Sequence, residues 1–243
     1  MDQSAPLLEL DRVFAGYGKM TILNGTSARV GRGAITTVIG PNGAGKSTMF
    51  KTVFGLLPAR SGTISFDGRD ITNCTPRQVL DAGIVFIPQG RNIFPELSVR
   101  HNLELGGVAL PDQGLLADRI AAIMRRFPIL QEKANAQAST LSGGQQKLLE
   151  LARVLVAEPR LILLDEPAAG VNAVLLETLV DRIVRLNRRG VTFLVIEHNI
   201  ELVLTLCRPV VVMAQGKLIY QGDAAGVRRD RRVLDAYLGD VPA

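Results

Sequence analysis

The chain has 243 residues, of which 47% are hydrophobic and 21% charged, and its formal net charge is +5. This length is enough for one sizeable core, with or without a subdomain. No apolar run approaches the roughly 18 residues of a membrane span. The start, Met1–Ser4, lacks the features of a secretory signal. Cys74 and Cys207 form no disulfide framework or metal-binding spacing, so we expect ordinary thiols in a reducing cytosol.

Four arginines lie close together near the C-terminus. Such a cluster can bind nucleic acid or anionic lipid, but it also occurs on solvated helix faces and in packing contacts. No aromatic residues are interleaved with these arginines to stack on bases. We therefore favour a solvated face or a packing contact, and expect no nucleic-acid partner, for Arg228, Arg229, Arg231 and Arg232.

The first third of the chain is rich in strand signals. Short apolar and β-branched runs alternate with turns such as Gly16-Tyr17-Gly18 and Gly31-Arg32-Gly33. A helix is expected directly after Lys46, and it should end near Gly55 because Pro58 follows. The predicted strands are residues 7–14, 21–30, 34–39, 62–67 and 83–88.

The middle of the chain has no strand signals and is dominated by helical patterns. Its last helix should begin near Ser142, because leucines recur beyond it at helical spacing. That helix must end before Pro159, since proline restricts the residue that precedes it. We therefore expect a helical insert at about residues 90–158 within a single domain that spans residues 1–243.

The last third combines strands with one helix. Residues 161–164 and 191–196 are apolar throughout, and residues 174–188 between them have a helical pattern. Apolar strands joined by a helix indicate a parallel sheet that is covered on both faces. Residues 210–214 and 217–221 predict a hairpin. The expected fold class is α/β, with a mainly parallel sheet, an antiparallel β subdomain and a helical subdomain.

A glycine-rich segment lies between a predicted strand and a predicted helix, which is the context of a P-loop. Its glycines let backbone amides approach phosphate oxygens, and the helix N-terminus adds a favourable dipole. Lys46 would reach the β- and γ-phosphates of ATP, and the Ser47 hydroxyl would bind Mg²⁺. A P-loop NTPase core is therefore expected around Gly40-Pro41-Asn42-Gly43-Ala44-Gly45-Lys46-Ser47-Thr48.

An acidic pair follows the apolar strand at residues 161–164. A buried parallel strand would place Asp165 beside the P-loop, where ligands bind in such folds. Asp165 would hold Mg²⁺, and Glu166 would polarise the attacking water. Without the P-loop, a loop with helix-start acids would explain the pair equally well. The two motifs together favour a catalytic role.

A second anion site is predicted at Leu141-Ser142-Gly143-Gly144-Gln145, where a serine and two glycines start a helix. A plain N-cap would account for Ser142. It does not account for the glycines, each of which costs about 1 kcal/mol against alanine in a helix. The glycines are explained if a ligand approaches the backbone closely.

In order and spacing, these motifs resemble the nucleotide-binding subunit of an ABC transporter. The resemblance covers essentially the whole chain and is specific, because the signature Leu141–Gln145 precedes the acidic strand end. It implies that Tyr17 stacks on adenine, and that Gln89 senses the metal or the attacking water and links the site to the membrane subunit. It also implies that His198 lies near the γ-phosphate.

Each of these three residues has a plainer interpretation. Tyr17 could be a turn residue, Gln89 a polar residue at a strand end, and His198 a strand cap. The resemblance favours the functional interpretations. The predicted catalytic residues are then Lys46, Gln89, Glu166 and His198, and the predicted metal ligands are Ser47, Gln89 and Asp165.

Within the family, several segments are similar to branched-chain amino acid importer ATPases of the LivF type. They are Phe14–Gly18, Gln89–Pro95 and Ala236–Gly239, together with Ala168-Ala169-Gly170-Val171-Asn172 after the acidic pair. Many family members carry a serine in that last segment, so a hydroxyl contact at Ala168 is not expected. Pro88–Arg91 is also similar to urea or amide importer ATPases, which remain an alternative.

The resemblance implies an assembly in which two cassettes pair head to tail around two ATP molecules. The second cassette is either this chain or a similar subunit. The signature of each cassette would act on its partner's ATP. Further implied partners are transmembrane permease subunits, which the region around Arg91–Leu105 would contact, and indirectly a periplasmic solute-binding protein. The chain would then lie peripherally on the cytoplasmic side of the inner membrane.

Two other classes are alternatives. A soluble ABC ATPase of the cluster-assembly type would share this architecture, but the LivF-like segments argue against it. A P-loop kinase would leave the signature Leu141–Gln145 unexplained.

Overall fold

The structure of the protein is a computed structural model that describes residues 5–90, 92–108, 110, 112–171, 173–198, 203 and 209–238. Within these residues the strands form two sheets, with the orders β10-β9-β3-β8-β7-β6 and β2-β1-β4-β5. Expectations that concern Met1–Ser4, Arg91, Asn172, Cys207 and Gly239 lie outside the described residues.

The elements follow the predicted order closely. The strands are β1 (Leu8–Ala15), β2 (Leu23–Val30), β3 (Ile35–Ile39), β4 (Ala59–Phe66), β5 (Arg69–Asp70), β6 (Ile84–Ile87), β7 (Leu161–Asp165), β8 (Thr192–Ile196), β9 (Val210–Ala214) and β10 (Lys217–Gly222). The helices are α1 (Lys46–Val53), α2 (Pro76–Asp81), α3 (Val99–Gly106), α4 (Gln113–Arg126), α5 (Pro128–Glu132), η1 (Ala138–Thr140), α6 (Gly143–Leu155), α7 (Ala173–Asn187), α9 (Ala224–Val227) and α10 (Arg231–Leu238).

The six-stranded sheet is parallel except for the β9–β10 hairpin, as expected. In its register, Val38 of β3 and Asp165 of β7 both pair with Ile196 of β8. The carboxyl ends of these strands therefore meet at one edge of the sheet, which is where ligands bind in open α/β sheets. The P-loop, the acidic pair and His198 follow these strand ends.

This sheet is buried on both faces at its centre, where β7 and β8 are buried at every position. Leu161 and Leu163 of β7 belong to one hydrophobic cluster, whereas Ile162 and Leu164 belong to another. The first cluster includes residues of α1 and of the antiparallel sheet, and the second includes residues of α4, α6 and α7. The prediction of a sheet covered on both faces is confirmed.

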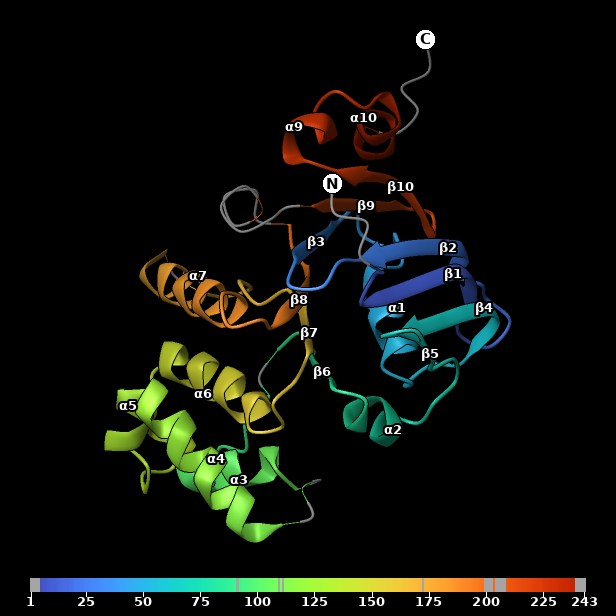
Figure 1. Cartoon of the computed structure of the whole chain (residues 1–243). Helices are drawn as coiled ribbons and strands as arrows, with labels where there is room; N and C mark the ends of the chain where they lie inside the picture. Colours follow the sequence, from blue (N-terminus) through green and yellow to red (C-terminus); the bar gives the residue numbers. More distant parts are fainter. Residues whose placement is uncertain are drawn as a thin grey trace.

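The antiparallel sheet lies beside α1 (Figure 1). In β1, buried and solvent-facing residues partly alternate, as expected for a sheet with one covered face. β4 begins at Ala59 and not near residue 62, because residues 59–61 continue the pairing with β1. β2 begins at Leu23, two residues later than expected.

Helices α3 to α6 lie between β6 and β7 in sequence and form a separate layer in space, at the lower left of Figure 1. Their starts follow from local chemistry: Ser98, Asp112 and Ser142 are N-caps, and Pro128 occupies the first turn of α5. Buried apolar residues of these helices join the cluster that covers one face of the main sheet.

The C-terminal segment packs α9 and α10 beside the β9–β10 hairpin (Figure 1). Two of the tail arginines make ion pairs with nearby carboxylates: Arg232 with Asp230 at 2.6 Å and Arg231 with Asp235 at 4.0 Å. These pairs agree with a solvated helix face. Among the described residues, no helix is both long and apolar enough to cross a membrane.

Candidate nucleotide-binding site

The P-loop joins β3 to α1 and depends on glycine for its shape. Gly40, Gly43 and Gly45 have φ angles of 153°, 80° and 97°, which other residues rarely adopt. A Cβ at Gly40 would lie 2.2 Å from the carbonyl oxygen of Met213, so β9 leaves no room for a side chain there. A Cβ at Gly43 would meet nothing within 4 Å, so the backbone is open to a ligand on that side.

Lys46 begins α1 and folds back over this loop. Its Nζ donates hydrogen bonds to the carbonyl oxygens of Gly40 at 2.8 Å and Pro41 at 3.0 Å. Burial lowers the pKa of Lys46 from its usual value, while the nearby Glu166 and Asp165 carboxylates oppose that shift. The ammonium is thus held at the mouth of the loop whose amides would bind phosphate.

Ser47 and Asp165 come together where α1 faces the end of β7. The Ser47 hydroxyl donates to Oδ1 of Asp165 at 3.4 Å. Burial raises the pKa of Asp165, and the hydrogen bond from Ser47 partly offsets the rise. A hydroxyl and a carboxylate are hard oxygen donors of the kind that Mg²⁺ prefers. Among the described residues no group of three or more His, Cys, Asp or Glu side chains is arranged to hold a metal.

The Glu166 carboxylate contacts two of the other predicted catalytic side chains at this edge, Gln89 and His198. Nε2 of Gln89 donates to its Oε2 at 2.6 Å, and Nδ1 of His198 lies 3.5 Å from its Oε1. The three residues follow the ends of β6, β7 and β8. Residues separated by up to 109 positions in the chain therefore form one polar group beside the P-loop.

The backbone at Glu166 is in an uncommon conformation. Its φ angle is +50°, although it is not a glycine, and its N–H donates to the carbonyl oxygen of Ile196 at 3.0 Å. A non-glycine residue in this region costs of order 1–3 kcal/mol and persists only where its surroundings enforce it. The backbone hydrogen bond from Glu166 to β8 is one such constraint, and it helps to position the Glu166 carboxylate.

Sequence reasoning missed Glu197, which is 1% exposed. Its Oε1 accepts the N–H of Ala168 at 2.8 Å, and its Oε2 accepts the N–H of His198 at 3.1 Å. One buried carboxylate thus positions the segment after Glu166 and the backbone of His198. The signal was an ionisable residue directly after four consecutive apolar strand residues, where burial is expected.

We expect Glu197→Gln to lower the free energy of unfolding by about 1–3 kcal/mol, because an amide group would face one of the two backbone N–H donors and leave it unpaired. Urea denaturation measures the change. Glu132→Gln, at an exposed position on α5, is the control and should leave the midpoint unchanged. Equal midpoints for Glu197→Gln and the wild type would contradict this role.

Tyr17 lies in the turn between β1 and β2 and is 47% exposed. Nζ of Lys51, on α1, lies 5.9 Å from the centre of its ring. The ring is therefore beside the helix that the P-loop starts, with its surface accessible. This location suits an aromatic residue that stacks on a nucleotide base.

The signature segment starts α6 with a capping box. Ser142 Oγ accepts the N–H of Gln145 at 3.4 Å, and Gln145 Oε1 accepts the N–H of Ser142 at 3.2 Å and a bond from Lys133 at 3.3 Å. Ser142 and Gly143 are exposed, and a Cβ at Gly143 would meet nothing within 4 Å. The N-cap interpretation is correct, and it leaves the glycine backbone facing open space. These side-chain bonds stay within the helical layer.

Two further residues of α6 were not anticipated. Glu150 is 2% exposed, and its Oε1 accepts the N–H of Asn92 at 2.8 Å. Lys147 pairs with Glu150 at 2.9 Å and donates to the carbonyl oxygen of Gly90 at 2.8 Å. The loop that follows Gln89 is therefore anchored to the helix that begins at the signature.

The fold and the geometry of the P-loop make this protein a P-loop NTPase. A protein-family model described as ABC transporter matches residues 23–169. The chain therefore belongs to the ABC transporter family, as its ATP-binding, ATP-hydrolysing subunit.

Relatives of known assignment match over nearly their whole length. BraG, a high-affinity branched-chain amino acid transport ATP-binding protein of Pseudomonas aeruginosa, is 34% identical over 96% of this chain and 100% of its own. A probable LivF protein of Archaeoglobus fulgidus, also named for branched-chain amino acid transport, is 34% identical over 90% of this chain and 92% of its own. LptB of Haemophilus influenzae, named for lipopolysaccharide export, is 32% identical over 96% of this chain and 98% of its own.

Solved structures agree with the fold. The ADP conformation of MJ1267, an ATP-binding cassette of an ABC transporter, superposes with a TM-score of 0.88 at 31% identity. The match covers 98% of this chain and 100% of MJ1267. The resemblance inferred from the motifs is therefore confirmed at the level of family, fold and enzyme class.

Proposed function

We propose that this chain is a single nucleotide-binding domain, with a helical subdomain at about residues 90–158, that powers the uptake of branched-chain amino acids by an ABC importer. The observation that supports this choice of solute is the similarity to BraG and LivF over nearly the whole chain. LptB supplies a second candidate, lipopolysaccharide export, because it matches over almost the same length. No observation favours the urea or amide alternative.

A transport assay tests the solute. Deleting the gene should abolish most high-affinity uptake of labelled leucine, isoleucine and valine, and restoring the wild-type chain should recover it. Uptake of an unrelated solute such as glucose is the control. Unchanged amino-acid uptake in the deletion strain would reject this solute, and a simultaneous defect in the outer membrane would favour the export alternative.

The roles of the site residues follow from their positions. Residues 40–48 would cradle the phosphates of ATP, with Lys46 exchanging its two carbonyl acceptors for phosphate oxygens. Glu166 would orient and polarise the attacking water, because its carboxylate faces the same edge of the sheet as the P-loop. Gln89 and His198 both contact that carboxylate and would position it against the γ-phosphate.

Mg²⁺ would be held by Ser47 and Asp165, with Gln89 as a further ligand, and it would neutralise charge on the phosphates. The 3.4 Å contact between the Ser47 hydroxyl and the Asp165 carboxylate supports this assignment. Tyr17 would stack on the adenine, since its exposed ring lies beside α1.

The exposed signature supports pairing of two cassettes. Ser142 and Gly143 present a helix N-terminus to solvent, on a layer separate from α1 (Figure 1). A helix N-terminus attracts anions, so these residues would bind the γ-phosphate of an ATP that a second cassette holds. ATP would then stabilise the pair, and loss of the γ-phosphate would weaken it.

We expect Ser142→Arg to spare ATP binding by the single chain and to prevent ATP-dependent pairing, because a bulky side chain would occupy the space needed by the partner's phosphate. Size-exclusion chromatography with light scattering, with and without ATP, measures pairing. Ser139→Arg, an exposed serine three residues earlier, is the matched control and should pair normally. Normal pairing of Ser142→Arg would refute the shared site.

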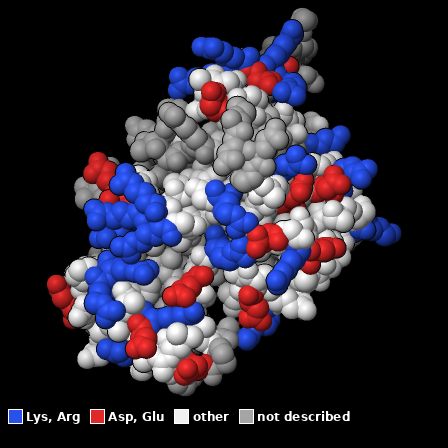
Figure 2. Space-filling model, in the orientation of Figure 1, with Lys and Arg blue, Asp and Glu red and all other residues white. Residues whose placement is uncertain are grey.

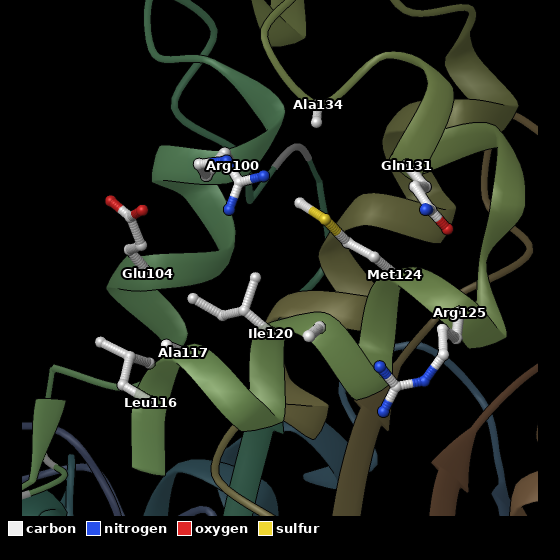
Figure 3. A pocket seen from close by; sticks show the side chains of 10 residues that line it. Arg100, Glu104, Leu116, Ala117, Ile120, Met124, Arg125, Gln131 and Ala134 are labelled. Carbon is white, nitrogen blue, oxygen red and sulfur yellow. The ribbon is translucent and has the colours of Figure 1, made fainter. Parts of the chain in front are cut away.

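A hollow in the helical layer is suited to a permease segment. Its volume is about 560 Å³, and α3, α4 and α5 surround it (Figure 3). Its floor is apolar, with Leu116, Ile120 and Met124 almost buried, and Arg100 and Glu104 lie along one side. Because α3 follows the loop after Gln89, a permease helix seated here would be joined to the catalytic edge by a short stretch of chain. The chain would thus work peripherally at the cytoplasmic face of the membrane, with a solute-binding protein as an indirect partner.

A further inference from the structure

A second, smaller hollow lies between the end of α4 and the end of α7, and of its lining residues only Arg125 also borders the hollow proposed for the permease. Its volume is about 200 Å³. Five of the seven lining residues are arginines, and none is acidic; we call it the basic pocket. It is lined by Arg125, Arg126, Phe127, Arg182, Arg185, Leu186 and Arg189. Figure 2 shows Lys and Arg gathered on this side of the molecule, over α7 and the helical layer.

Most of the positive charge in the basic pocket is not neutralised by the protein. Arg185 pairs with Asp181 at 2.8 Å, on the outer face of α7. Within the described part of the chain, Arg125, Arg126 and Arg189 have no carboxylate within ion-pair distance. Like charges held together without counter-charges oppose folding, so an arrangement of this kind needs a compensating contact.

Arg182 is oriented by an aromatic ring and carries an unsatisfied donor. Its guanidinium lies 5.6 Å from the centre of the Phe127 ring, which is 3% exposed. Its Nε is buried and has no hydrogen-bond partner. Leaving a buried donor unpaired costs about 1–3 kcal/mol, and an acceptor entering the pocket would remove that cost.

We propose that the basic pocket binds an anion that carries two or more phosphate charges. Guanidinium groups match phosphate oxygens in planar, bidentate geometry, and several of them around one hollow can neutralise several charges at once. A single carboxylate would leave most of the five arginines unpaired. The same chemistry is presented by a soluble polyphosphorylated compound and by the headgroup of an anionic lipid.

The nucleotide site does not account for this pocket. Asp165, at the catalytic edge, ends β7, and α7 then returns the chain to Thr192, which pairs with Leu161 at the start of β7. The end of α7 therefore lies at the opposite edge of the sheet from the P-loop. The pocket does adjoin the apolar hollow of Figure 3, since Arg125 lines both.

The test uses the full chain saturated with ADP, so that the nucleotide site is filled and no hydrolysis occurs. Inorganic tripolyphosphate is titrated by calorimetry without Mg²⁺. The pocket variant is Arg126→Gln/Arg189→Gln, because both side chains are exposed and unpaired and their loss should not unfold the protein. The matched control, Arg228→Gln/Arg229→Gln, removes the same charge from the exposed C-terminal tail.

We expect the pocket variant to bind tripolyphosphate at least about tenfold more weakly than the wild type, and the tail control to stay within about twofold. Both variants should keep wild-type ADP affinity. Equal weakening of the two variants would show that only net charge matters, and would overturn the proposal. Wild-type tripolyphosphate affinity in the pocket variant, together with unchanged binding to the lipid vesicles described next, would also overturn it.

A second arm identifies the source of the phosphate. Sedimentation with phosphatidylcholine vesicles, with and without cardiolipin, whose headgroup carries two phosphates, measures lipid binding. Binding that requires cardiolipin and is lost in the pocket variant alone supports the proposal with a lipid headgroup as ligand. Tripolyphosphate binding lost in the pocket variant, without vesicle binding in the wild type, supports it with a soluble ligand.

Discussion

Glu166→Gln should still bind ATP but lose steady-state hydrolysis, with a fall in kcat of about 10²–10⁴, the usual contribution of a general base. Glutamine keeps the size of the side chain and can still contact Gln89, but it cannot accept a proton from water. The variant should therefore accumulate as a closed, ATP-bound pair. Phosphate release measures turnover, and light scattering measures the pair.

Glu158→Gln is the matched control, because Glu158 also has a positive φ, of 51°, and lies outside the catalytic edge. It should hydrolyse ATP at the wild-type rate. Near-normal turnover of Glu166→Gln would remove Glu166 from its proposed role and would leave the P-loop assignment untouched.

Lys46→Ala should reduce ATP affinity by more than about 100-fold, because it removes a charge-assisted contact to the phosphates. Without nucleotide the variant should remain folded. Burial lowers the pKa of Lys46, which means that the buried ammonium is partly desolvated at a cost in free energy, and alanine removes that cost. Fluorescence titration with a labelled ATP analogue measures affinity, and thermal unfolding verifies the fold.

Arg77→Ala, on α2, removes one surface cation away from the P-loop and is the control for net charge. Its ATP affinity should equal that of the wild type. Tight ATP binding by Lys46→Ala would contradict the assignment of residues 40–48 as the phosphate-binding loop.

The parts of the fold that sequence predicted best are those where one physical rule dominates. The strands β7 and β8 are buried on both faces, so neither shows an alternation of apolar and polar residues. The start of α6 was predicted from Ser142, whose capping box fixes the helix end. The P-loop followed from its glycines, whose backbone angles few other residues adopt.

Other elements were missed for identifiable reasons. α2 carried a signal, because Thr75 and Gln78 form a capping box and Pro76 stands in its first turn, but its six residues are too few for a periodic pattern. β5 has two residues and exists only through its pairing with β4. The C-terminal helices α9 and α10 have only four and eight residues, which is too short for a clear periodic pattern.

Within the candidate site, the sequence suggested candidate residues but not their contacts. No local pattern predicts that Gln89 and His198 converge on one carboxylate, because that depends on the order of β6, β7 and β8 in the sheet. Glu197 and Glu150 escaped notice because their importance lies in the backbone amides they accept, which only the folded chain brings within reach.

The anchoring of the loop after Gln89 to α6 has a consequence for a pair of cassettes. In the proposed assembly Gln89 would contact the ATP site of its own chain, whereas the start of α6 would contact the ATP bound by the partner. Glu150 and Lys147 join the loop after Gln89 to α6 by hydrogen bonds and an ion pair. In that assembly the occupancy of each site would be transmitted to the other through this single helix, and the two hydrolysis events would be cooperative.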